Sequence, residues 1–230
     1  MYIDRNIKGA YRFPSCKRCN ESSKESDQIA ALSACIMGSA TSSHLPQNYV
    51  EKLIQGVANN SPEFFGYFGS NDKSIWLNVN GLLREQYRVE IDNEVRVKWL
   101  DPWAVKQALA FWYHHTNSIL PEKGRVFVHW IFNEGLEGHD KFLKKATEMM
   151  PNLQFNQQGM HGNSDQYFYR VGIDFKKRIG SFLFGYHQSA HVWCIVFENG
   201  SDELLSKGLP IYMTSKENGI ELFLQPIPKK

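Results

Sequence analysis

The chain has 230 residues, 42% of them hydrophobic and 13% aromatic, which is enough to bury a sizeable core and excludes disorder by composition. Its 26 Lys and Arg residues stand against 24 Asp and Glu residues, and the net charge of +2 excludes a strong overall attraction to nucleic acid or to acidic substrates. No run of about 18 apolar residues is present to span a bilayer, and residues 1–13 are too polar for a signal peptide. We therefore expect a cytoplasmic protein that makes no contact with a membrane.

Three segments in the first half of the chain have the hydrophobic spacing of amphipathic helices. Apolar residues recur every three or four positions in 27–37, after Pro46, and in 102–116. These positions are Ile29, Leu32, Cys35 and Ile36 in the first segment, Tyr49, Val50, Leu53, Ile54 and Val57 in the second, and Val105, Ala108, Leu109, Trp112 and Tyr113 in the third. Asp101 and Pro102 favour a helix start, since an Asp side chain caps free amides and Pro lacks an amide hydrogen. We expect the second helix to pack on the first, and the third to lie against a sheet.

Strand-like runs become frequent after the third of these segments. Two short strands are expected at 74–79 and 94–100, a longer one at 125–132, and a further helix at 139–150. Beyond Pro151, β-branched and aromatic runs alternate with Gly, Asn and Ser clusters at 166–173, 181–186, 192–197 and 209–213. The predicted fold is therefore α+β, with a helical N-terminal half packed against a mainly antiparallel sheet in the C-terminal half.

Two cysteines near the N-terminus, Cys16 and Cys19, have the Cys-x-x-Cys spacing that lets a tight turn direct both sulfurs at one zinc ion. A structural zinc site needs four ligands, and no second pair with this spacing follows; the nearest candidates are Cys35 and His44. Cys35 falls on the apolar face of a predicted helix, where a buried free cysteine is the commoner explanation. Two interpretations therefore remain: half of a zinc site, or a pair of ordinary reduced cysteines.

Positive charge is concentrated around this motif. Residues 1–24 hold six basic residues against two acidic ones, a local net charge of +4 that leaves −2 for the other 206 residues. The basic residues are Arg5, Lys8, Arg12, Lys17, Arg18 and Lys24. Lysine and arginine side chains in such a segment can neutralise phosphates, so DNA or RNA is the expected partner of the basic N-terminal segment.

The stretch Phe13–Asn20, followed by Asp27 and Gln28 at the start of a helix, resembles the second half of the zinc-ribbon HNH-like proteins of bacteria. Residues 105–121 and the runs 167–171 and 193–197 are similar to a helix and the closing strands of those proteins. The resemblance implies zinc as a cofactor, with Cys16 and Cys19 as ligands. It also implies a basic zinc-ribbon-like remnant at 1–24 and a single α+β globular domain at 25–230, with residue 100 as the candidate point of subdivision.

The catalytic part of that family is not matched. HNH nucleases use a histidine to activate water and a metal to polarise the phosphate. In the family the catalytic His and the first Cys pair precede the matched stretch, whereas none of the 8 histidines of this sequence precedes Cys16, and only Asn20 could correspond to the core motif. We therefore expect a non-catalytic, nucleic-acid-associated protein that lacks the N-terminal catalytic part. The alternative is a globular interaction or scaffold protein that binds neither metal nor nucleic acid.

Two histidine pairs are further candidates for metal ligands. His114 and His115 are adjacent in a helix and point about 100° apart, so packing and capping of the helix C-terminus is the better interpretation. His187 and His191 flank a predicted turn, where a metal clip is a weaker interpretation than ordinary turn polarity.

The basic run Lys176–Arg178 follows the aromatic residues Tyr167, Phe168 and Tyr169. Together they could form a basic patch with aromatic side chains that stack on bases. A solvated hairpin end is the favoured alternative.

Overall fold

The computed structural model describes residues 17, 21, 23–38, 47–67, 73–79, 82–88, 93–132, 167–186, 190–199 and 211–213. Helices come first and most strands follow, so the predicted α+β class is confirmed. The helical elements are α2 (Lys24–Gly38), α3 (Gln47–Asn60), α4 (Glu63–Gly66), α5 (Asn93–Val95), the π-helical segment Arg96–Leu100, and α6 (Asp101–Thr116). The strands are β1 (Lys73–Val79), β2 (Leu82–Arg88), β3 (Arg125–Phe132), β4 (Tyr167–Asp174), β5 (Ile179–Tyr186), β6 (Ala190–Phe197) and β7 (Ile211–Met213).

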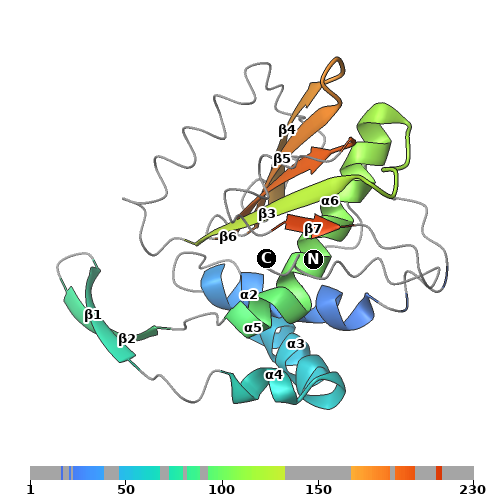
Figure 1. Cartoon of the computed structure of the whole chain (residues 1–230). Coiled ribbons are helices and arrows are strands. Elements are labelled where there is room, and N and C mark those ends of the chain that lie inside the picture. Colours follow the sequence, from blue (N-terminus) through green and yellow to red (C-terminus); the bar gives the residue numbers. More distant parts are fainter. Residues whose placement is uncertain are drawn as a thin grey trace.

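Five strands form one antiparallel sheet in the order β4-β5-β6-β3-β7. Hairpins join β4 to β5 and β5 to β6. Strand β3, the first of these five strands in the chain, lies beside β6. This arrangement is of Greek-key type. Figure 1 shows α6 against this sheet, while the β1–β2 hairpin stands apart from it. The described strands thus confirm the predicted antiparallel sheet of the C-terminal half.

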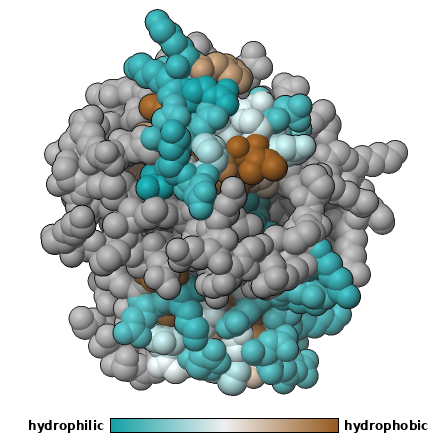
Figure 2. Space-filling view, turned by 45° about the vertical axis from the view of Figure 1, so that its right-hand side comes forward, coloured by the Kyte–Doolittle hydropathy of each residue, from teal (hydrophilic) through white to brown (hydrophobic). Residues whose placement is uncertain are grey.

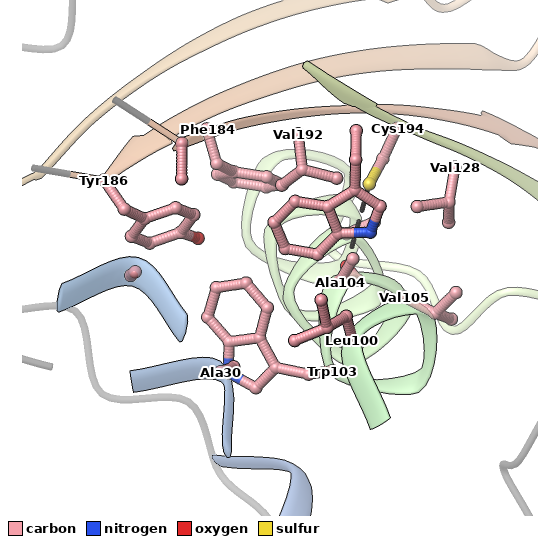
Figure 3. Packing of buried hydrophobic residues seen from close by; sticks show 14 of the residues in the cluster. Ala30, Leu100, Trp103, Ala104, Val105, Val128, Phe184, Tyr186, Val192 and Cys194 are labelled. Atoms are coloured by element: carbon pink, nitrogen blue, oxygen red, sulfur yellow. Dashed lines mark hydrogen bonds between the residues drawn. The ribbon is translucent and has the colours of Figure 1, made fainter. Parts of the chain in front are cut away.

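Helix α6 buries its apolar side on one face of the sheet. Figure 3 shows Phe184, Val192 and Cys194 of the sheet directed toward α6, and the core cluster includes the helix residues Ala104 and Ala108, both fully buried. Small residues let the helix backbone approach the strands closely, and alternate strand residues fill the space between them. Side chains on the opposite face of the sheet are buried as well, namely Phe127, Ile131, Leu183, Trp193, Ile195 and Phe197.

The N-terminal helices pack on each other and on the first half of α6. Ile29 and Leu32 of α2 and Val57 of α3 are fully buried, as the helical spacing predicts, whereas Ile54 is 41% exposed and does not belong to the buried face. One hydrophobic cluster joins these helices to α6 and to the sheet. The predicted packing of the second helix on the first is therefore observed in α2 and α3.

Residues 94–100, predicted as a strand, are helical instead. Val95, Trp99 and Leu100 are buried on one side of α5 and the π-helical segment, and Trp99 makes an edge-to-face contact with Phe64 at 5.7 Å. The spacing of these three residues fits a helix face, and burial against neighbouring helices outweighs the strand preference of Val and Trp. A π-helical turn commonly marks a local irregularity within a longer helix.

The expected helix start at Asp101 and Pro102 is also corrected. The π-helical segment runs directly into α6, and the Asp101 side chain is buried rather than capping a helix start. Its Oδ1 accepts a hydrogen bond from Trp130 Nε1 at 2.8 Å, and its Oδ2 lies 3.5 Å from Arg96 Nε. A buried carboxylate requires such partners because desolvation of a charge is costly.

The outcome for the other predicted elements is mixed. The strands at 74–79 and 125–132 and the four strands after Pro151 are observed with small changes at their ends, while β2 was not predicted. The helix predicted at 139–150 lies outside the described residues. The domain limits at 1–24 and 25–230 stay a prediction from the sequence.

Candidate functional site

The predicted zinc ligands Cys16 and Cys19, with Asn20, lie outside the described residues. Lys17, between the two cysteines, and Glu21, directly after Asn20, are helical and exposed. Within the part of the chain that the structure describes, no group of three or more His, Cys, Asp and Glu side chains could hold a metal ion. The zinc site therefore stays a prediction from the sequence.

Cys35, the nearest candidate for a third ligand, is a core residue of α2. Its side chain is 1% exposed, and burial raises the pKa of the thiol to about 11. Zinc binds the thiolate, so a group that holds its proton this firmly is poorly suited as a ligand. The sequence-based interpretation of Cys35 as a buried free cysteine agrees with this position, and His44 lies outside the described residues.

The start of α2, four residues after Cys19, is fixed by a charged network. Lys106 Nζ of α6 donates to Ser23 Oγ at 2.5 Å and to Asp27 Oδ2 at 2.9 Å and Oδ1 at 3.2 Å. Ser23 Oγ in turn donates to Asp27 Oδ2 at 3.1 Å. Both carboxylate oxygens of Asp27 are therefore engaged, and the first turn of α2 is tied to the middle of α6.

Two more polar contacts hold the same end of α2. Trp99 Nε1 donates to Glu25 Oε1 at 2.6 Å, and Asn60 Nδ2 of α3 donates to Gln28 Oε1 at 2.9 Å. Both acidic side chains of the first turn, Glu25 and Asp27, are thus bonded to the body of the protein, while Lys24 beside them is exposed. The sequence does not reveal this network because the partners that link different helices are 32 to 83 residues apart along the chain.

The patch of Lys176–Arg178 with Tyr167, Phe168 and Tyr169, the less favoured of the two interpretations, does not form. Strand β4 carries Tyr167 and Tyr169 into the core, where Tyr169 contacts Phe111 of α6 with ring centroids 4.5 Å apart. Lys176 and Lys177 lie in the turn beyond the far end of β4 and are exposed. Because successive strand residues advance about 3.3 Å, the strand separates the buried tyrosines from the lysines. The favoured alternative, a hairpin end, is observed.

The pair His114 and His115 packs at the end of α6. Their rings are perpendicular with centroids 4.9 Å apart, and His115 also stacks on Phe111 at 6.3 Å. Burial, followed by the positive charge of His114, lowers the pKa of His115. The helix end is closed by Asn117, which adopts a left-handed conformation with φ of 53° and donates its amide to the Tyr113 carbonyl at 2.8 Å. Packing is thus confirmed, and Asn117 takes the capping position.

The second histidine pair cannot be tested as a pair, since His187 lies outside the described residues. His191 is partly buried on β6, where burial lowers its pKa, and its ring contacts Phe168 with centroids 5.5 Å apart. Cys194 on the same strand donates to the Ala104 carbonyl at 3.7 Å, and burial raises the pKa of its thiol. These groups serve the packing of the sheet.

No protein-family model, no curated protein and no solved structure matches this chain. The similarity to zinc-ribbon HNH-like proteins therefore rests on the short motifs themselves. Among the helices that the structure describes, none has the length and apolar character needed to cross a membrane.

Proposed function

We propose that this chain is a non-catalytic, nucleic-acid-associated protein in which Cys16 and Cys19 bind zinc and the basic N-terminal segment contacts phosphates. The observation that carries the proposal is the arrangement at the start of α2. The two acidic side chains of its first turn, Glu25 and Asp27, are bonded to Trp99 and Lys106, whereas the basic side chain of Lys24 is exposed.

This arrangement reduces the repulsion that an anion would meet at the start of α2. Salt-bridging by Lys106 offsets the negative charge of Asp27, so the acidic first turn opposes a phosphate less than its composition implies. Exposed Lys17 and Lys24 supply positive charge on both sides of Cys19. Anchoring by α6 fixes the start of α2, to which the basic segment is joined, and this reduces the ordering entropy lost on binding.

Hydrolysis is not part of the proposal. Phosphodiester cleavage of the HNH type needs a water-activating histidine beside a metal. In this sequence no histidine precedes Cys16, and the described histidines lie on α6, β3 and β6. We expect no nicking of supercoiled plasmid with magnesium, manganese or zinc. Metal-dependent nicking that is abolished by Cys16→Ala or Asn20→Ala would overturn the non-catalytic assignment.

Zinc content tests the metal part of the proposal. Purified protein should contain stoichiometric zinc, and Cys16→Ser or Cys19→Ser should remove it, because each substitution deletes a thiolate ligand. Cys35→Ala is the matched control, since this buried thiol is placed in the core of α2 and its loss should leave the zinc content unchanged. Zinc-free wild-type protein would contradict the metal site.

A salt-titrated binding curve with double-stranded DNA tests the partner. Binding should be independent of the DNA sequence and should weaken as salt rises. The double variant Lys17→Gln with Lys24→Gln should lower the slope of log K against log salt by about 1.8, because each phosphate contact on B-DNA contributes about 0.9. Lys52→Gln, at an exposed lysine of α3, is the control. Protein that holds no zinc and binds no nucleic acid would favour the interaction or scaffold alternative.

A further inference from the structure

The turn between β4 and β5 presents an aromatic side chain to solvent. Phe175 is 61% exposed, although Asp174 and Ile179 on either side of the turn are paired in the sheet. The Asp174 Oδ1 atom accepts hydrogen bonds from the backbone amides of Lys176 at 3.0 Å and Lys177 at 2.9 Å. These bonds form an Asx-type turn that orders the backbone on which Phe175 is carried.

Arg178 fixes the other side of the turn in an unfavourable conformation. Its φ of 57° lies in the left-handed region, which is unfavourable for a residue other than glycine. The guanidinium pairs with Glu198 through Nε, and through Nη2 at 2.7 Å, while the Glu198 amide donates to the Arg178 carbonyl at 3.1 Å. The same guanidinium lies 5.8 Å from the centre of the Trp112 ring. Side chain and backbone together hold the turn against its strain.

Lys176 and Lys177 carry two positive charges at the tip, against the one negative charge of Asp174. Glu198 offsets the charge of Arg178, and Asp174 Oδ2 lies 4.0 Å from Lys177 Nζ, whose side chain is 74% exposed. A pair this exposed is screened and opens readily. Two lysines therefore stay available beside one exposed ring.

The Arg178 side chain reaches the segment after α6, which carries a second exposed apolar side chain. Arg178 Nη2 approaches Ser118 Oγ at 3.5 Å, and the neighbouring Ile119 is 83% exposed. Figure 2 shows a face of the molecule on which brown and tan apolar groups lie among teal hydrophilic ones. Mixed apolar and basic character of this kind suits a ligand with flat apolar groups on an anionic backbone.

We propose that the β4–β5 turn is a contact site for single-stranded nucleic acid, on which one base stacks against Phe175 while Lys176 and Lys177 contact the adjacent phosphates. This inference rests on the proposed association with nucleic acid and assigns a second contact to it, apart from the N-terminal segment. Every base has a flat face that can stack on an aromatic ring, so the contact is independent of sequence. The ordered turn favours binding because Phe175 is presented without a further ordering cost.

The test is the binding of the full chain to a fluorescent single-stranded oligothymidylate across a salt series. Phe175→Ala and Phe175→Leu should each weaken binding about tenfold, since leucine keeps the apolar surface but cannot stack. Lys176→Gln with Lys177→Gln should lower the slope of log K against log salt by about 1.4, because each phosphate contact on a single strand contributes about 0.7. All of these variants should keep the wild-type Tm, since the three side chains are exposed.

Controls separate the two proposals. Ile54→Ala and Lys52→Gln alter exposed residues of α3 and should leave binding unchanged. If Phe175→Ala binds as wild type while Lys17→Gln with Lys24→Gln weakens binding, the turn is not a contact but the proposed function stands. If wild-type protein binds neither single-stranded nor double-stranded DNA, both proposals fail. Equal affinity of Phe175→Leu and wild type, with Phe175-dependent binding to vesicles of anionic phospholipid, would overturn the stacking contact in favour of a membrane surface.

Discussion

The two sides of α6 differ in how much polar interaction accompanies their apolar packing. Toward the sheet, Ala104, Ala108 and Trp112 are buried to 1% exposure or less. Toward α2, the shared hydrophobic cluster is supplemented by the pair between Lys106 and Asp27, whose side chains are 35% and 38% exposed. Apolar burial contributes stability in proportion to area, whereas a half-exposed ion pair contributes little and depends on direction.

The two sides of α6 therefore contribute differently to the stability of the protein and to the placement of α2. The sheet side supplies the free energy that keeps α6 in place, and loss of a side chain there leaves a cavity. Polar contacts on the α2 side fix where the first turn of α2 lies, and with it the point from which the basic segment emerges. We expect substitutions on the sheet side to change the free energy of unfolding and those on the α2 side to change mainly nucleic-acid binding.

The largest effect is expected on the sheet side, at Trp112. This side chain is 1% exposed, and Trp112→Ala should lower the free energy of unfolding by about 3–5 kcal/mol through lost burial and a residual cavity. The neighbouring Tyr113, which is 39% exposed, is the control, and Tyr113→Ala should cost less than about 1 kcal/mol. Denaturant titration measures both, and a cost below about 1 kcal/mol for Trp112→Ala would show that this side of α6 does not carry the stability.

An added methyl group on the same side should cost less. A Cβ on Gly180 of β5 would lie 2.9 Å from Phe182 Cε2 and 3.0 Å from Trp112 Cε3, closer than packed carbon atoms allow. Gly180→Ala should therefore destabilise the protein by about 1–3 kcal/mol, since buried rings must shift. Gly66→Ala, where a Cβ meets nothing within 4 Å, is the matched control and should be close to neutral. Equal midpoints in urea for the two variants would contradict the close approach of β5 to α6.

Most of the sheet side could be predicted from the sequence because its pattern is local. The helical spacing that ends in Trp112 and the alternating runs at 125–132 and 192–197 each identify their element without knowledge of the rest of the chain. The β1–β2 hairpin also had a local signal that was overlooked: Val79 pairs with Leu82, and the two residues between them in the sequence are Asn80 and Gly81, the commonest pair in short hairpin turns.

The parts that were not predicted depend on distant partners. Residues 94–100 have the local composition of a strand, and only the packing of Trp99 against Phe64 explains why they are helical. Asp101 stands where the sequence predicts a helix cap. Its side chain is instead a buried acceptor for Trp130, which is 29 residues away in the sequence. At the candidate site, the cysteines are visible in the sequence, but the link from Lys106 to Asp27 joins residues 79 positions apart and leaves no periodic pattern.

On the α2 side, a double-mutant cycle should reveal a small coupling. Lys106→Met keeps most of the apolar stem and removes the charge, and Asp27→Asn removes its partner. Their coupling energy should be about 0.2–1 kcal/mol, because both side chains are more than one-third exposed, and it should decrease as salt rises. DNA binding by Lys106→Met should weaken although its stability changes little. A coupling above about 2 kcal/mol would place stability on this side as well and remove the contrast between the two sides of α6.

The smallest effect concerns pH, and it arises at a partly buried histidine on the sheet side of α6. On the sheet side, His115 contacts Tyr169, and burial lowers its pKa, so the native state resists protonation there. In the unfolded chain the imidazole keeps its ordinary pKa of about 6.5, and as the pH falls through that value the unfolded state binds the proton first. The free energy of unfolding should therefore fall between pH 8 and pH 5, a range in which Glu198, whose pKa is lowered by Arg178, stays ionised.

Urea titrations at several pH values and salt concentrations measure this effect. His115→Gln should reduce the loss of stability toward pH 5 but not abolish it, since burial also lowers the pKa of His191 on β6. His114→Gln is the control and should remove only the weaker charge repulsion that His114 exerts on His115. Added salt should weaken the Lys106–Asp27 link while leaving the contribution of burial at His115 in place, because desolvation is not screened by ions. A pH dependence that is the same in His115→Gln and wild type would show that water reaches His115. Burial would then not lower the pKa of this histidine.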